Sequence, residues 1–567
     1  MARKMMRSIA LGLLFGTALG FGQNEDSSNA SLLTVDTLSS VASNKETPFL
    51  AAVAAPTDHK AIQNKQNLFF ALDEGQIMRG AYNSGATYTA INRTWQERMT
   101  LHLANDMTYQ DRMHFILSFE CQLSFSFLPY NSVPATLTPQ FNFYPNDVEI
   151  NYSFGQLDKP WMKLAVGYFP FKYNPDAKDL GEYLMRSNAY PSFIVNDFEF
   201  PMTRELGLHI SGNSAWLFDQ SIDKINWDIL LTSETHAYSW PTQDWTLTAV
   251  ASNSLLNCLD IGGGVSFQRL LSVDESKTSP EKAGYPNMYY GEGGKTDTQY
   301  ISFKATKLMG RASINPQRFI PEFKIPFWPL FGETPIFGKE DLKVYGEVAV
   351  LGLKNYVAYG PDSVIVDSAT NAKAWLPASK IPINNYARFY DSLADRMPYM
   401  IGIDLPTHPL LSYGIIPFLL TKWLRDETGD DIRPLSYVLL IPALASGFAS
   451  HYLGWDLGLD EFSLECEWAS QRFPNSNQKV ITFGTATGPM PIPVPDTRSN
   501  FGITPMQVKY ALYFKKSFKD NRFALSGLVG RDHMKPSENA PPVDQQTDDF
   551  LQTKNQWWWM LRFSAQF

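Results

Sequence analysis

The sequence predicts an all-β membrane protein, a closed antiparallel transmembrane β-barrel of about 16 strands, within a range of roughly 14 to 18. Three observations predict it: an export signal at the amino terminus, many segments of alternating apolar and polar residues, and an alternating last strand that ends in phenylalanine. We expect long extracellular loops, some of them helical, between the strands.

The amino terminus has the pattern of a secretory signal peptide. Arg3, Lys4 and Arg7 precede an uncharged apolar run from Ile9 to Phe21, which is too short to span a bilayer. We therefore expect residues 1–22 to be cleaved on export.

The rest of the chain divides into two parts. Residues 23–66 are rich in Ser, Thr, Asn and Ala without a sustained period, and we expect a flexible periplasmic segment there. Residues 67–567 would form the barrel, with long loop insertions, notably residues 406–454.

Composition fits a barrel better than a set of soluble domains. Aromatic residues make up 14% of the chain while the mean hydropathy is only −0.22, because each strand shows lipid one face and water the other.

Without the three basic residues of the signal peptide, 45 of the 48 basic residues remain against 57 acidic ones, a net charge of −12. This charge makes nucleic acid an unsuitable partner. Cys121, Cys258 and Cys466 are far apart in the sequence, and we expect them to be unpaired.

The clearest strand signal runs from Arg112 to Phe127. Every odd position is apolar, whereas Ile116 is the one apolar residue at an even position. A period of two is that of a β-strand, and about sixteen residues at ~3.3 Å each exceed a tilted span of the hydrocarbon. We expect this strand to protrude from the bilayer.

Shorter segments repeat the pattern, and two of them, Val148–Phe154 and Met162–Tyr168, form a predicted hairpin. The further strand candidates are Val148–Phe154, Met162–Tyr168, Trp95–Leu103, Leu206–Ile210, Ile225–Leu231, Trp245–Ala249, Ile261–Phe267, Ile301–Ala305, Leu342–Val350, Tyr399–Leu405, Trp455–Leu459, Phe462–Trp468, Val508–Phe514, Phe523–Val529 and the carboxyl terminus. About 14 barrel strands would remain if two of these were loop strands. Tryptophans near strand ends are expected at headgroup level: Trp161, Trp245, Trp455, Trp468 and Trp557.

The last strand carries Trp559, Leu561, Phe563 and the terminal Phe567 on one face. This dozen-residue pattern resembles the terminal signal of bacterial outer-membrane proteins, which the barrel-insertion machinery recognises. An ordinary edge strand that happens to be last is the alternative.

Residues 434–455 contain no charged residue, so hydropathy alone would suggest a transmembrane helix. Pro442 and Gly447 weaken that interpretation. We expect instead a loop that folds into the lumen or over the rim, in which Ile415–Leu424 could form the other half of a helical hairpin, joined by the acidic turn Asp426–Asp431. That turn lacks the ligand spacing of a calcium loop, so we expect it to be a solvent-exposed surface loop. Weak binding of a divalent cation is the alternative.

Motifs for chemistry are weak. Gly293–Thr296 resembles a phosphate-binding loop but lacks its first glycine and its helix, and Gly262–Gly264 fits a strand bend. His209 and Ser211 stand two apart, as in outer-membrane phospholipases, but Gly212 replaces the asparagine of that family. We predict polar lumen lining there, and no enzyme, cofactor or metal site.

Charged residues on the face opposite each apolar stripe would line a lumen, where they could orient solutes or select ions, or only pair with one another and hydrate the wall. The candidates are Arg98, Arg112, His114, Glu120, Glu149, Lys163, Asp228, Lys304, Lys343, Glu347, Glu465, Glu467, Lys509 and Arg562.

Signal peptide, strand series and terminal phenylalanine together resemble the porin class of bacterial outer-membrane barrels. The resemblance implies a channel for passive diffusion of small polar solutes or ions, located in the outer membrane of a Gram-negative bacterium. Its implied partners are outer-membrane lipid, lipopolysaccharide, the insertion machinery, periplasmic chaperones and small solutes, with a homotrimer as one assembly. A closed structural or adhesive barrel that displays surface loops is the alternative, and an outer-membrane enzyme comes third.

Overall fold

In the computed structural model the barrel wall, several connections and one external helix are placed. The structure describes residues 62–83, 88–126, 140–155, 160–184, 203–214, 225–233, 245–255, 258–271, 287–290, 296–299, 305–319, 337–350, 364–366, 373–375, 397–430, 458–468, 508–519, 521–532, 551, 553 and 555–567. The predicted signal peptide therefore lies outside the described residues.

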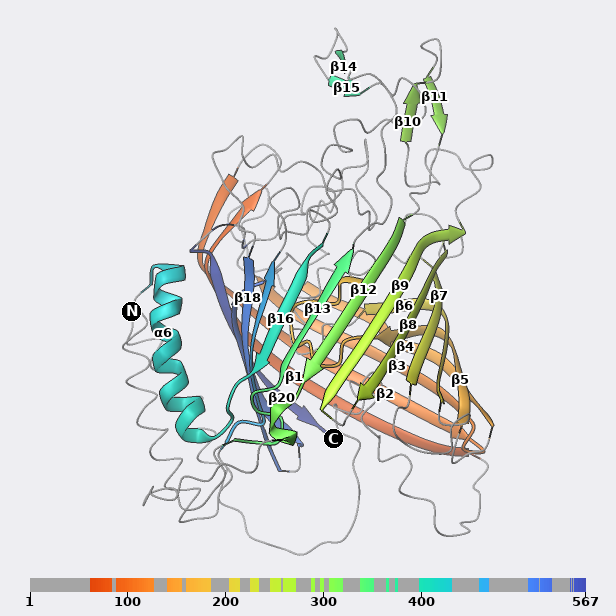
Figure 1. The fold of residues 1–567 in the computed structure, drawn as a ribbon, viewed down its shortest axis with the longest axis horizontal. Coiled ribbons are helices and arrows are strands. Elements are labelled where there is room, and N and C mark those ends of the chain that lie inside the picture. The colour runs from red at the N-terminus through yellow and green to blue at the C-terminus, as the bar shows by residue number, and fades with distance from the viewer. Residues whose placement is uncertain are drawn as a thin grey trace, which may run out of the picture.

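Sixteen antiparallel strands form one closed barrel (Figure 1), which confirms the predicted fold. Strand β1 pairs with β2 on one side and with the last strand, β20, on the other, so no edge is left open. In order around the wall the strands are β1 Ile62–Asn83, β2 Tyr88–Tyr109, β3 Met113–Ser126, β4 Gln140–Gly155, β5 Pro160–Phe171, β6 Thr203–Asn213, β7 Ile225–Ser233, β8 Trp245–Leu255, β9 Leu259–Leu271, β12 Ala305–Ile314, β13 Val344–Val350, β16 Tyr399–Asp404, β17 Glu461–Trp468, β18 Val508–Phe518, β19 Phe523–Arg531 and β20 Trp557–Gln566.

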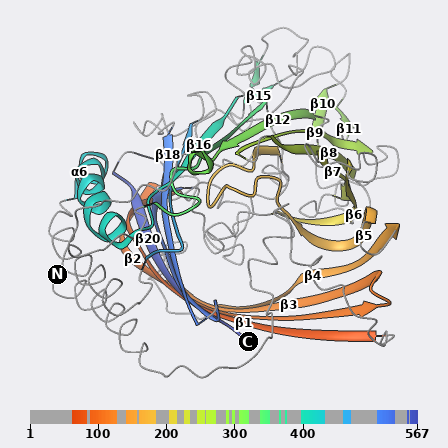
Figure 2. The same ribbon diagram turned by 60° about the horizontal axis from the view of Figure 1, so that its bottom comes forward.

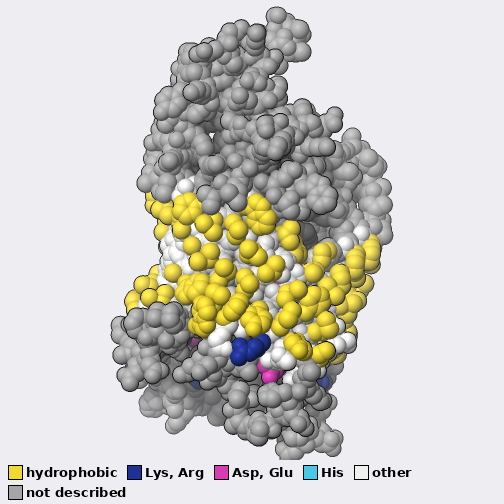
Figure 3. Space-filling view, turned by 90° about the vertical axis from the view of Figure 1, so that its right-hand side faces the viewer, with side chains coloured by type: hydrophobic (Ala, Val, Ile, Leu, Met, Phe, Trp, Pro, Cys, Tyr) yellow, Lys and Arg dark blue, Asp and Glu magenta, His cyan; other side chains and the backbone are white. Residues whose placement is uncertain are grey.

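Side-chain alternation explains which face is inside. On β3, Ser118, Glu120 and Gln122 are buried in the interior, while Met113 on the opposite face is 38% exposed. The outward residues of the other strands are mostly apolar, and Figure 3 shows them as a broad belt on one face of the molecule. Its exposed members include Val166, Ile229, Ile261, Ile401 and Phe563. Cys121, Cys258 and Cys466 are free, as predicted.

Strand β1 was not predicted. Its alternation is masked because Phe69 and Phe70 are adjacent and because Glu74 faces outward. Since β1 begins at Ile62, its first five residues fall within the segment 23–66 that we expected to be flexible.

Two other predicted strands are displaced. Strand β12 covers Ala305–Ile314, whereas the sequence placed a strand at Ile301–Ala305. Residues 301–304 lie outside the described part. Residues 458 and 459, the described end of the predicted strand Trp455–Leu459, are not β-structure. Gly458 and Asp460 are bends, and the Asp460 carboxylate accepts a bond from the backbone N–H of Ser517 on the neighbouring strand β18.

The connections at one end of the barrel carry two small sheets. Strand β10 Asn287–Tyr290 pairs with β11 Thr296–Gln299, and β14 Val364–Val366 pairs with β15 Lys373–Trp375. A 3-10 turn, η4, follows β12 at Pro316–Arg318 near the other end, capped by Asn315.

The connection after β16 forms a helix on the outside of the barrel. A π-helical turn, η7 Leu410–Ile415, continues into α6 Ile416–Thr428, which runs along the outer wall beside β18 (Figure 1). The Trp423 ring packs on outward-facing Tyr510, with ring centroids 4.8 Å apart. The described part of the connection 406–454 therefore does not fold into the lumen or over the rim as we expected, because its apolar residues cover the apolar outer wall.

The upper end of α6 is pinned to the barrel. Asp430 accepts a 3.0 Å bond from Trp557 Nε1 and forms an ion pair with Arg79, which also donates to the carbonyl of Thr428. Gly429, in the left-handed region at φ 73°, ends the helix. Residues 431–457, which include the whole uncharged segment 434–455, lie outside the described part. No helix within the described part is long and apolar enough to cross a membrane.

Candidate functional site: a loop held inside the barrel

The connection after β5 enters the barrel instead of leaving it. Figure 2 shows this segment, residues 172–184, crossing the interior toward β12 and β16. We call it the inner loop. No strand candidate from the sequence falls in this segment, since a stretch of Lys, Asn, Pro, Asp and Gly has no period that would reveal its destination.

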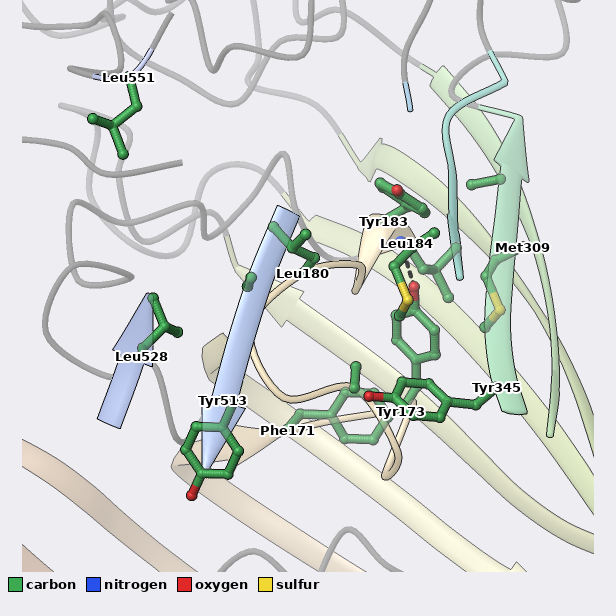
Figure 4. Packing of buried hydrophobic residues seen from close by; sticks show 14 of the residues in the cluster. Phe171, Tyr173, Leu180, Tyr183, Leu184, Met309, Tyr345, Tyr513, Leu528 and Leu551 are labelled. Carbon is green, nitrogen blue, oxygen red and sulfur yellow. Dashed lines mark hydrogen bonds between the residues drawn. The ribbon is translucent and has the colours of Figure 1, made fainter. Parts of the chain in front are cut away.

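Apolar side chains of the inner loop pack against the wall (Figure 4). Tyr173, Leu180 and Leu184 are at most 4% exposed, and they belong to one cluster with the wall residues Met309 and Tyr345. Burial of large side chains is worth about 1.5 to 3 kcal/mol each, so this packing holds the loop to one side of the lumen.

Glu465 on β17 is the main polar anchor of the inner loop. Its carboxylate accepts bonds from three consecutive backbone N–H groups, those of Lys178 (2.5 Å), Asp179 (2.9 Å) and Leu180 (2.8 Å). The hydroxyl of Tyr345 donates a fourth bond of 2.8 Å. A buried carboxylate that is saturated with donors in this way strongly favours one loop conformation.

Two further wall carboxylates continue the anchorage. Glu347 on β13 accepts bonds from Tyr183 N (2.8 Å), the Tyr173 hydroxyl (2.7 Å) and Asn174 Nδ2 (2.8 Å). Glu467 accepts a longer bond of 3.3 Å from Gly181 N. All three predicted lumen glutamates of β13 and β17 thus face the interior and meet on the inner loop.

Ion pairs also hold the middle of the loop. Lys178 Nζ lies 3.0 Å from Glu461, and Lys343, another predicted residue, pairs with Asp176. Lys172 Nζ donates to the carbonyl of Ala177, 2.6 Å away. The loop is therefore held by charge as well as by packing.

The backbone conformation at position 181 requires glycine. Its φ is +92°, and a Cβ built there would lie 2.9 Å from Met400 Cε and 3.1 Å from Glu347 Cδ. We expect Gly181→Ala to lower the free energy of unfolding by about 1 to 3 kcal/mol, measured by urea titration in lipid vesicles. Gly310→Ala, where the added atom meets nothing nearer than 4.0 Å, is the control. Equal stability of the two variants would contradict this account of Gly181.

Two inner-loop carboxyls make loop docking sensitive to pH. Burial raises the pKa of Asp179 well above its usual range, with Asp532 and Glu465 adding to the rise. Burial, with Glu347, does the same to the pKa of Glu182, although Lys172 opposes it.

A carboxyl group whose pKa is higher in the folded than in the unfolded protein stabilises the fold while it is protonated. This contribution is fully present below the unfolded-state pKa of about 4 and is lost as the pH rises through the folded-state pKa. We therefore expect the melting temperature in detergent to fall from pH 4 to pH 8. Asp179→Asn should flatten this slope, and an identical slope in that variant would exclude Asp179 as its cause.

A second cluster of predicted residues joins the two ends of the chain. Asp73 of β1 accepts bonds from Arg98 Nε of β2 (2.8 Å) and Arg562 Nε of β20 (2.7 Å). All three side chains are at most 5% exposed. The sequence prediction included both arginines but missed Asp73, because it missed β1.

The wall of β5 to β7 carries the third group. His209 Nε2 lies 2.9 Å from Asp228 Oδ1, and its ring stacks on that of Phe169 and meets that of Phe171 edge-on. His209 is thus bonded to Asp228, which supports polar lining for this wall and for Ser211 beside it.

The other predicted residues are more scattered. His114 on β3 bonds to Thr108 on β2, while Glu149 accepts a bond from Asn151 and Glu120 one from Gln122, each on its own strand. Lys509 donates to the carbonyls of Asp532 and Leu551, and Lys163 stands opposite Ser211 in the register. Arg112 lies in the turn between β2 and β3, not on a strand, because Gln110 and Asp111 take left-handed conformations; it donates to the carbonyl of Gly155. Lys304 lies outside the described residues.

No protein-family model matches the sequence, and no curated protein matches it. Solved porin structures are similar to the chain. A triple mutant of the Rhodopseudomonas blastica porin is 7% identical, with 89% of this chain and 100% of that chain covered and a TM-score of 0.33. Salmonella typhi OmpF, in complex with daunomycin, is 7% identical over 89% and 98% of the two chains, with a TM-score of 0.37. Pseudomonas putida OprB at low pH is 8% identical over 89% and 92%, with a TM-score of 0.34. The evidence for the barrel architecture is the strand pairing of this chain itself.

Proposed function

We propose that the chain is an outer-membrane channel for passive diffusion of small polar solutes or ions. One observation carries the proposal: a closed wall turns apolar side chains outward in a belt and polar or charged side chains inward. Hydrocarbon outside and water inside is the environment that satisfies both faces.

Solvent reaches the interior on the side that the inner loop leaves open. On the wall of β2–β7, the side chains of Asp106, His114, His209 and Asp228 are 37%, 18%, 20% and 25% exposed. These residues face inward, so their exposure indicates water within the barrel rather than around it. The inner loop would then narrow the path without filling it.

A closed structural or adhesive barrel is the second candidate function. The apolar cluster that includes Tyr183, Leu528 and Trp558, all at most 1% exposed, favours it, because part of the interior is as tightly packed as a protein core. The small sheets β10–β11 and β14–β15 lie in connections beyond one end, where they could contact a surface.

Planar-bilayer recording of the purified mature protein separates the two candidates. Discrete conductance steps support the channel, whereas silence across several preparations favours the closed barrel. Substituting His209 or Ser211 should leave conductance steps in place, because we assign these residues to the polar lining and not to catalysis.

Export and insertion complete the proposal. The signal peptide would direct export, and periplasmic chaperones and the insertion machinery would recognise the last strand. Its residues face outward, where Trp559 meets Trp95 edge-on at 5.7 Å and Phe563 stacks on Phe523 at 6.1 Å. Phe567 is 60% exposed. Lipid and lipopolysaccharide would contact the belt, and a homotrimer stays a prediction.

A further inference from the structure

Two glutamates interrupt the apolar belt. Glu74 of β1 and Glu97 of β2 are register partners, and both are exposed on the outer face. The outward row on one side of them contains Leu72 and Met99, and the row on the other side contains Trp95. On strands β3 to β17, by contrast, every outward side chain that the structure describes is uncharged.

This position is unfavourable for a carboxylate that faces lipid. Charged side chains on the lipid face of a barrel cost up to a few kcal/mol near the midplane, and less for Asp and Glu than for Arg or Lys. Two like charges directly opposite on neighbouring strands add repulsion. A cation brought by a neighbour within the membrane would remove both costs.

The same chain carries exposed cations on the adjacent flank. Lys422 and Arg425 of α6 point away from the barrel, on the side of the helix where Leu419 is 63% and Ile415 is 45% exposed. In the structure, no carboxylate lies within ion-pair distance of either cation among the described residues, although Asp426 follows on the helix.

The two charged patches lie at similar depth. Arg79 of β1 holds the end of α6, and Glu74 is five residues before it on the strand. At ~3.3 Å per residue and a tilt of about 40°, Glu74 lies about 12 Å below that contact. Lys422 is seven residues before Gly429, or about 11 Å below it at 1.5 Å per residue.

We propose that a second copy of this chain covers the flank, with Lys422 and Arg425 of one copy opposite Glu74 and Glu97 of the next. Acidic and basic patches occupy different flanks, and barrels in one membrane stand parallel, so each copy would present its acidic patch to one neighbour and its basic patch to another. Ile415 and Leu419 would supply the apolar part of the interface. The proposal rests on the proposed membrane location.

Charge reversal tests the contact in the full mature chain, purified in detergent, whose molar mass is measured by light scattering. We expect an oligomer for the unmodified protein and a loss of assembled fraction of about tenfold or more for Glu74→Lys with Glu97→Lys. Adding Lys422→Glu and Arg425→Glu to that variant should restore assembly. Lys519→Glu with Arg522→Glu, in the turn between β18 and β19, is the control and should stay assembled.

A disulfide gives a second measurement if the reversed variants fail to fold. In a background without the native cysteines, Glu97→Cys with Lys422→Cys should form a linked oligomer in membranes. A monomeric unmodified protein, or assembly indifferent to both reversals and no cross-link, would overturn the proposal. Conductance recorded in parallel separates the two claims, since a conducting monomer refutes the assembly and leaves the channel intact.

Discussion

Replacing Asp73 with alanine is expected to lower the free energy of unfolding by about 3 to 5 kcal/mol, because it leaves the buried charges of Arg98 and Arg562 without their shared partner. The residue also bridges β20, β1 and β2, so its loss weakens the seam that closes the barrel. Urea titration of the folded protein in lipid vesicles measures the effect.

Asp228→Ala is the matched control for Asp73. Asp228 also faces the interior and bears one acidic group, but its side chain is 25% exposed and its ion-pair partner is His209. Partly exposed pairs contribute about 0 to 1 kcal/mol. If both variants lost the same stability, the buried triad would not be a special feature of the wall.

Replacing Glu465 with glutamine is expected to release the inner loop and raise the single-channel conductance severalfold. The amide keeps one acceptor oxygen and turns an NH₂ group toward backbone N–H donors that now lose their partner. Each hydrogen bond to a charged group is worth about 1.5 to 3 kcal/mol, and Glu465 accepts four of them.

Glu149→Gln provides the comparison for Glu465. Glu149 lies on the wall opposite the inner loop, and its hydrogen bond is to Asn151 on its own strand. This variant should change ion preference without a large change in conductance. Equal conductance of the unmodified protein and Glu465→Gln would show that the loop does not restrict the path.

Strand alternation allowed most of the wall to be predicted from the sequence. A period of two depends only on which face meets lipid, so β3 and β20 could be located from their own residues. Strand β1 could not, since outward Glu74 and inward Ile77 reverse the expected pattern. If the second-copy contact is correct, that reversal reflects a neighbour that the sequence of one strand does not show.

The interior site could be predicted only in part. Glu347, Glu465 and Glu467 were identified because they oppose apolar stripes, but their meeting on one loop depends on contacts between residues more than 160 positions apart. The inner loop has no periodicity, and its conformation is fixed by the wall. The helix at Ile415–Leu424 was anticipated, whereas its place on the outer wall depends on Tyr510 and Trp557.

Labelling of neighbouring residues on β7 tests the central claim that water fills the barrel and lipid surrounds it. In a background whose three native cysteines are replaced by serine, Asp228→Cys faces the interior and Ile229→Cys faces the belt. A bulky water-soluble thiol reagent added during single-channel recording should reduce the current through the Asp228 variant and leave that through the Ile229 variant unchanged. Block through Ile229→Cys, or no block through Asp228→Cys, would contradict it.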